Sequence, residues 1–358
     1  MNRIYLLAPL SFFFICTKTV AQVGIGTTTP NAASALHVDV GANPTNGLLV
    51  TGAYSASATV PNLGVGSRLM FYPGKGAFRA GIALGTEWDN VNVGSASVAM
   101  GYSTYARGTA STALGDGNQA NGTSSVAMGA NASATADYST ALGTSITASG
   151  ILSMAFGHAV NTNNQRGAFI MGDSNPLNSS QTDSGFPDEF VARFNNGYYF
   201  LTSGNVNRFG VSIGHFGNAW VSICDKNRKE NFEELNGEDV LQKLSKINFT
   251  SWNYKMQDPN IYRHYGIMAQ DFYQAFGHDK FGSIGNDTTV NPIDMIGIDM
   301  TAIKALEKRT ENLKGENLRL QQSVTQLEIA FNEQKKLSDT QQTKIDKLEL
   351  QMKELLKR

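Results

Sequence analysis

A pentapeptide that recurs at a fixed spacing constrains the fold of this chain more than any other feature. The pattern Ser-x-Ala-x-Gly appears every 14 residues without slippage, beginning at Ser97, Ser111, Ser125, Ser139 and Ser153. Self-similarity at a constant period is typical of a solenoid. Each 14-residue repeat has room for two short strands and two tight turns, with glycine supplying the positive φ that each turn requires. The sequence therefore predicts a β-roll over residues 95–172.

The repeat also predicts which side chains stack on one another. Side chains of a strand point alternately to its two faces, so equivalent residues of successive coils form columns. One predicted column is apolar and contains Met100, Leu114, Met128, Leu142 and Phe156. The small Ser, Ala and Gly positions form another column. A second half-repeat follows in phase at Ala106, Ala120, Ala134 and Ala148.

These repeats resemble the head of trimeric autotransporter adhesins of the YadA type. The resemblance implies a left-handed parallel β-roll in which three chains pack side by side. A narrow coil of two strands buries little surface alone, so association of identical chains is expected. Two interpretations of the head stay open, namely an adhesive surface for an unknown surface or carbohydrate ligand and a simple spacer.

The C-terminal segment has a different composition and a different period. Residues 303–358 contain 12 Lys or Arg and 9 Asp or Glu, whereas residues 95–164 contain only Arg107, Asp116 and Asp137 as charged side chains. One unbroken heptad frame places Ile303, Thr310, Asn317, Val324, Phe331, Ser338, Ile345 and Met352 at a. The d positions are Leu306, Leu313, Leu320, Leu327, Gln334, Gln341, Leu348 and Leu355. This pattern predicts an α-helical coiled coil.

Two separated motifs between the roll and the heptads carry a second resemblance. Cys224-Asp225 is followed by Lys229 and Asn231, and Ala269-Gln270 comes later, after His264. Together they resemble the C-terminal intramolecular chaperone of phage tailspikes and endosialidases, which cuts itself off after folding its trimer. That family opens on Ser-Asp, has a Lys five residues after the Ser, and ends its pattern near Gly-x-x-Ala-Gln. Lys229, Asn231 and Ala269-Gln270 match, whereas Cys224 occupies the place of the Ser.

The resemblance implies a chemistry for residues 222–302. Cys224 would attack the carbonyl of Ile223, cutting the Ile223–Cys224 bond, and Lys229 would act as the base. Asn231 would position the loop, and His264 would polarise the carbonyl or orient the base. The domain would then be a single-turnover self-cleaving endopeptidase. In the alternative interpretation Cys224 is a small buried residue, and the domain is an uncleaved trimerisation unit.

The N-terminus reads as a secretory signal over residues 1–21. Arg3 forms a basic start, residues 4–15 an apolar run, and Thr19-Val20-Ala21 a small-residue cleavage site. A lipoprotein anchor at Cys16 is the alternative. No later segment is predicted to cross a membrane. Cleavage after Ala21 would leave Cys224 as the only cysteine, in a protein that is secreted or displayed on the cell surface.

The remaining segments are predicted from short patterns. The β-rich N-terminal region 22–94 has candidate strands at 35–40 and 47–50. In the β-rich connector 173–221, residues 189–194 and 198–201 are expected to form a hairpin around Asn196-Gly197, with a further strand at 209–214. Their aromatic side chains could bind sugars or pack a trimer core. The chaperone domain is expected to contain helices at 237–244 and 267–276 and a strand at 249–254.

Charge and residue types exclude several functions. The net charge of −1 implies neither nucleic acid nor an anionic membrane as a partner. The five histidines are scattered and no Cys-x-x-Cys is present, so neither a metal nor a cofactor is predicted. The sequence predicts a mainly β homotrimeric fibre protein, secreted or on the surface, whose chaperone domain templates trimer folding and self-cleaves. The alternative is an adhesin that keeps this domain and the coiled coil as a stalk.

Overall fold

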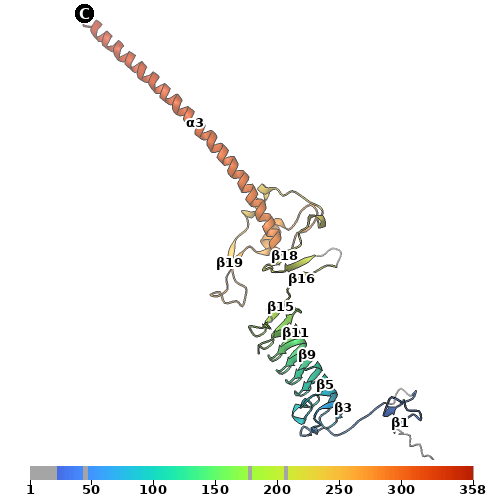
Figure 1. Ribbon diagram of the computed structural model, residues 1–358. Coiled ribbons are helices and arrows are strands. Elements are labelled where there is room, and N and C mark those ends of the chain that lie inside the picture. Colours follow the sequence, from blue (N-terminus) through green and yellow to red (C-terminus); the bar gives the residue numbers. More distant parts are fainter. Residues whose placement is uncertain (1–21, 43–46, 176–179, 205–208, 358) are drawn as a thin grey trace, which may run out of the picture. The chain divides into compact units, whose positions relative to one another are not determined.

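The computed structural model describes residues 22–42, 47–175, 180–204 and 209–357. The chain divides into two compact units at the junction between Ile223 and Cys224. The first unit contains a stack of short parallel strands, and the second contains a small mixed region followed by one long helix (Figure 1). The predicted signal peptide, with Arg3, Cys16 and Ala21, lies outside the described residues.

Two short parallel strands open the described chain. Strand β1 (Val23–Ile25) pairs with β2 (Leu36–Val38), which confirms the centre of the strand expected at 35–40. The strand expected at 47–50 is wrong, because these residues belong to no sheet in the described chain. Leu48 is 81% exposed, so the short apolar run at this point packs against nothing that could hold a strand.

The predicted β-roll is confirmed as a solenoid. It is entered by an antiparallel hairpin of β3 (Gly66–Tyr72) and β4 (Ala77–Ala83), and β4 then starts a row of parallel strands. The row continues through β5 (Val98–Tyr102), β7 (Thr112–Asp116), β9 (Val126–Ala134), β10 (Thr140–Ala148), β11 (Met154–His158), β13 (Phe169–Gly172) and β15 (Phe190–Arg193). From β5 to β11 each residue pairs with the residue 14 positions later, as Ala99 does with Ala113.

A second row of strands forms the other side of each coil. It contains β6 (Tyr105–Ala106), β8 (Gln119–Ala120), the later halves of β9 and β10, β12 (Val160–Asn161) and β14 (Thr182–Asp183). The interior between the two rows is lined by alanine and serine. Its fully buried side chains include Ala99, Ala113, Ala127, Ala141, Ala155, Ser97, Ser111, Ser125, Ser139 and Ser153. The coil is narrow because most of the side chains that fill it are small.

The predicted apolar column exists, and it faces outward. Met100, Leu114, Met128, Leu142 and Phe156 are in register from coil to coil. Since the alanine one residue before each of them points inward, the pleat turns this column to the outside. Met100 is 42% exposed in the single chain. The column therefore contributes to an outer surface of the roll.

The prediction that glycine supplies the positive φ of every turn is correct only in part, because Gly117 does so at one corner and other residues do so elsewhere. One corner is occupied by left-handed non-glycine residues, namely Ala96, Ala110, Ser124, Tyr138 and Leu152. Their backbone N–H groups bond to the preceding coil, as Ser124 does to the carbonyl of Thr109 at 2.7 Å, which offsets the conformational cost. The glycine that ends each Ser-x-Ala-x-Gly repeat lies within a strand, and both its positive φ and its close approach to the next coil exclude a side chain. At Gly129 φ is +123°, and a Cβ would lie 2.0 Å from the oxygen of Gly143.

The solenoid extends beyond residue 172, the predicted end of the roll, and this extension overturns the predicted hairpin. Residues 190–193 form β15, which pairs in parallel with β13 and not with residues 198–201. The rings of Phe156, Phe169 and Phe190 stack in succession, with centroids 5.5 and 5.4 Å apart, and hold β15 to the roll. Strand β16 (Gly197–Leu201) pairs instead with β17 (Gly210–Gly214), the strand expected at 209–214, and β18 (Val221–Ser222) completes this sheet.

The second unit has a small core of its own. Helix α1 (Gly237–Leu244) has the predicted bounds, and β19 (Thr250–Trp252) lies within the predicted strand. Strand β20 (His264–Gly266) pairs with β19, so α2 (Ala269–Phe276) starts two residues later than expected. Val240, Ile247, Phe272, Phe276 and Ala302 form the buried cluster.

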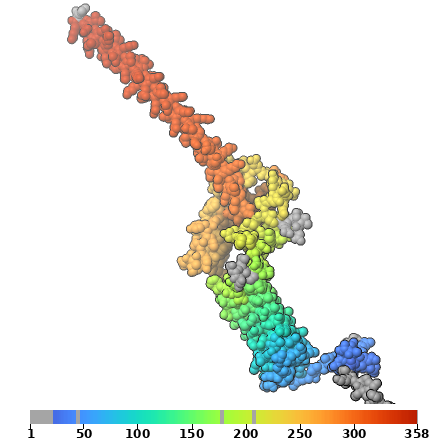
Figure 2. All heavy atoms as spheres, in the orientation of Figure 1, coloured from blue at the N-terminus to red at the C-terminus, as the bar shows by residue number. Residues whose placement is uncertain are grey.

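The last helix, α3 (Pro292–Leu355), is continuous through the predicted heptads. Asn291 caps its start by accepting a hydrogen bond from the backbone of Ile293, and Pro292 occupies the first turn. Beyond Ala305 every described residue of the helix is exposed in the single chain, as Figure 2 shows for its length. The a and d side chains, such as Leu313 and Leu320, therefore form an apolar stripe without a partner in the described chain.

Candidate functional site

The loop that begins the second unit brings Cys224 and Lys229 together. Asp225 accepts a hydrogen bond from the backbone N–H of Asn227 and so caps a 3-10 turn, Lys226–Arg228. The backbone N–H of Lys229 closes that turn on the carbonyl of Lys226. As a result the chain folds back, and Lys229 Nζ donates to Cys224 Sγ at 2.8 Å.

The loop is open to solvent in the single chain. Every residue from 221 to 236 is exposed, and Cys224 is a free thiol. Both members of the pair are exposed in the single chain, whereas the alternative interpretation expects Cys224 to be buried.

Asn231 and His264 are placed differently from the pair. Asn231 has φ of +57°, a left-handed conformation that Asn tolerates better than most residues, and it turns the chain just after Lys229. His264, on β20, has Nε2 3.3 Å from Gln257 Oε1, and its ring centroid lies 4.7 Å from that of Trp252. Among the described contacts of His264 none is with Cys224 or Lys229. The roles predicted for both residues remain predictions.

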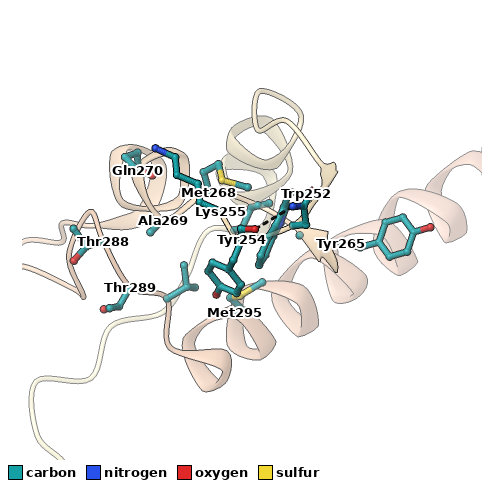
Figure 3. A pocket seen from close by; sticks show the side chains of 14 residues that line it. Trp252, Tyr254, Lys255, Tyr265, Met268, Ala269, Gln270, Thr288, Thr289 and Met295 are labelled. Carbon is teal, nitrogen blue, oxygen red and sulfur yellow. Dashed lines mark hydrogen bonds between the residues drawn. The ribbon is translucent and has the colours of Figure 1, made fainter. Parts of the chain in front are cut away.

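A cleft of about 930 Å³ in the second unit was not expected from the sequence (Figure 3). Trp252 at the end of β19 and Tyr254 just after it line one part of the cleft. Met268, which precedes α2, and Met295 of α3 line other parts. The Nε1 of Trp252 is buried there with no hydrogen-bond partner among the described residues. The alternation of residues 249–254 predicted a strand, but it gave no sign of the apolar side chains from other segments that line the cleft.

The solenoid presents two unlike outer faces. On the first row, a second outward column runs beside the Met100 column and contains Phe78, Val98, Thr112, Val126, Thr140, Met154, Phe169 and Phe190. On the second row, the corresponding outward positions are mostly polar: Tyr105, Gln119, Ser133, Thr147 and Asn161. One face of the roll is thus apolar along its length and the other is hydrophilic.

The described residues contain no group of three or more His, Cys, Asp or Glu side chains arranged to hold a metal ion. Their helices also include none with the length and apolar character needed to span a bilayer.

Comparison with known protein families gives two matches. Residues 224–279 match the family model described as chaperone of endosialidase, and the match begins at Cys224 itself. Residues 93–118 and 120–145 match two copies of the YadA head domain repeat. No curated protein and no solved structure gave a significant match. The solenoid is therefore similar to YadA-type head repeats, and the segment after it, which starts at the Cys224–Lys229 pair, is similar to the chaperone of endosialidase.

Proposed function

We propose that this chain is a homotrimeric fibre protein of the secreted or surface-displayed kind, whose second unit templates the assembly of the trimer. The unit then cuts the chain between Ile223 and Cys224 and so releases the mature fibre. The observation that carries the cut is the contact of Lys229 Nζ with Cys224 Sγ at the first residue of the chaperone segment.

Two unpartnered apolar surfaces support the trimer. The outward columns of the solenoid, which include Met100 and Met128, run the length of one face. The a and d stripe of α3 is exposed in the same way, and a helix with this pattern is stable when it pairs with others. Association of three copies would bury both surfaces, at a burial gain of roughly 25 cal/mol for each Å² of apolar surface.

The pair supports a cut with a nucleophile and a base in contact. Cysteine reacts as its thiolate, and neighbouring cationic side chains favour that form. Lys229 is held within hydrogen-bond distance of the sulfur by the capped turn. In the proposed sequence of events the trimer forms first and its packing excludes water from the loop. The Lys229 amine can then accept the thiol proton.

A second candidate function is an adhesin that is never cut. It is favoured by the exposure of Cys224 and Lys229, since a solvated ammonium is a poor base. In that protein the second unit and α3 remain as a permanent stalk. The solenoid would be the adhesive or spacing part in both cases, and its ligand would be a surface or carbohydrate.

The templating role is tested by comparing two chains in one expression host. One is the mature chain from residue 22, and the other stops at Ile223. The second unit supplies chain register, and parallel rolls need such non-local contacts before they gain stability. The full chain should give soluble trimers by light scattering, and the shortened chain should be insoluble or monomeric. Equally fast assembly of both chains into trimers would refute the templating role.

A further inference from the structure

We infer that the cut at Cys224 proceeds through a thioester on Ile223, and that a primary amine can take the place of water in resolving it. The second unit would then act as an acyl-transfer device that joins the C-terminus of the first unit to an amine. This inference rests on the proposed self-cleavage, and it adds the class of acyl acceptor to it.

The thioester follows from the position of the sulfur. Cys224 Sγ and the carbonyl carbon of Ile223 are joined through Cβ, Cα and the backbone nitrogen of Cys224, so attack on this carbonyl closes a five-membered ring. Attack on the carbonyl of Cys224 itself would close a strained four-membered ring. The Ile223–Cys224 bond also lies between the end of β18 and the capped turn, outside any strand or helix.

The bonds and protons of the first step balance within the chain. The thiol gives its proton to the Lys229 amine, and the sulfur forms a bond to the Ile223 carbonyl carbon. The bond from that carbon to the Cys224 nitrogen breaks, and Lys229 returns the proton to the leaving nitrogen. The products are a thioester between Ile223 and Cys224 Sγ and a free amino group on Cys224.

The second step distinguishes a thiol from a hydroxyl nucleophile. A primary amine attacks the thioester carbonyl, an amide bond forms, and the Cys224 sulfur leaves and recovers a proton. Thiolates are much better leaving groups than alkoxides, because their conjugate acids are stronger. Amines therefore resolve thioesters faster than the oxygen esters that a serine would form.

The open loop gives an acceptor access to this carbonyl. All residues from 221 to 236 are exposed, and the described part of the chain contains no second cysteine that could capture the acyl group. Lys229 Nζ, the amine in contact with the sulfur, is occupied as the base. The amino group of Cys224 that the first step releases can re-form the peptide bond, so an acceptor from solution or from a cell surface traps the thioester in competition with this reversal and with water.

The test uses the full mature chain with hydroxylamine or glycinamide added during assembly. Intact mass spectrometry then compares the C-terminus of the fragment 22–223. The inference predicts a hydroxamate or a glycinamide amide on Ile223, in a share that rises with nucleophile concentration. Cys224→Ser is the matched control, and its cut fragment should carry at least roughly ten times less adduct because its ester resists amines. Cys224→Ala should give neither fragment nor adduct.

The failures of the two proposals are separable. A fragment that ends in a free carboxylate at every nucleophile concentration would overturn the thioester inference and leave self-cleavage standing. Absence of any fragment, with or without nucleophile, from a chain that forms trimers would overturn both.

Discussion

Lys229 Nζ lies 2.8 Å from Cys224 Sγ at the first residue of the segment that matches the endosialidase-chaperone family. The contact exists because Asp225 caps a single turn between the two residues and returns the chain on itself. Both side chains are exposed in the single chain, so the chemistry of the pair is expected to depend on what assembly adds around it.

The first prediction separates a base from a fixed charge at position 229. Lys229→Arg keeps the positive charge beside the sulfur, but a guanidinium does not deprotonate in proteins. If Lys229 is the base, this variant should assemble into trimers and remain uncut, as should Lys229→Ala. Gel electrophoresis of the purified trimers measures the cut. Normal cleavage by Lys229→Arg would show that the amine is not needed as a proton acceptor.

The outward column of the solenoid predicts where a charge prevents assembly. Met128→Asp puts a carboxylate on the apolar face, where burial between chains would leave it unpaired at a cost of several kcal/mol. Light scattering should then show loss of the trimer. Thr135→Asp is the control, because Thr135 belongs to the same coil and lies on the polar side. Equal effects of the two variants would contradict the assignment of the apolar face as the interface.

Two substitutions within one coil should change stability in opposite directions. Ser124 has φ of +53° and an exposed side chain, so Ser124→Gly removes left-handed strain and should stabilise the fold by up to about 1 kcal/mol. Gly129→Ala should destabilise it, because the new Cβ would lie 2.0 Å from the oxygen of Gly143. Thermal unfolding of the two variants measures this. A stabilising Gly129→Ala would contradict the packing of the coils.

The pH dependence of the last coil rests on Asp173. The backbone N–H of Asn195 donates to its carboxylate at 2.7 Å, and this bond, together with the one from the Asn175 N–H and the positive charge of Arg193 3.6 Å away, lowers the pKa of Asp173. A lowered folded-state pKa contributes stability that is present above the unfolded pKa of about 4 and is lost as the pH falls through the folded value.

Asp173→Asn removes this contribution. At neutral pH the variant should be less stable than the parent by about 1 kcal/mol, and the difference should shrink as the pH falls through the folded-state pKa of Asp173. Unfolding temperatures measured across the acid range give the comparison. Curves that stay parallel down to the lowest pH would contradict a carboxylate that is stabilised in the folded state.

Much of the fold follows from periodicity alone. The 14-residue register is carried by the sequence itself, so Ala99 opposite Ala113 could be predicted. The last coil could not, because residues 190–193 come 21 positions after their partners, and the stacking of Phe190 on Phe169 replaces the repeat as the cause. The Asn196-Gly197 dipeptide correctly predicted a turn. It did not predict the strand pairing, because β15 pairs with β13 of the solenoid and β16 pairs with β17.

The candidate site was predictable only in its local part. Lys229 and Cys224 lie on one short loop, and a capped turn suffices to join them. His264 is distant in sequence, and its neighbours Trp252 and Gln257 are set by the pairing of β19 with β20. The left-handed corners were also missed, because Ala96 and Tyr138 adopt this conformation through bonds between coils that no single repeat displays.

The central claim is that the chain cuts itself at Cys224, and intact mass spectrometry of the protein from its native compartment tests it most directly. The account predicts two species, a fibre ending at Ile223 and a released unit running from Cys224 to Arg358, and a single uncut species for Cys224→Ala. A parent trimer consisting only of full-length mature chains would contradict it, as would fragments that persist in Cys224→Ala.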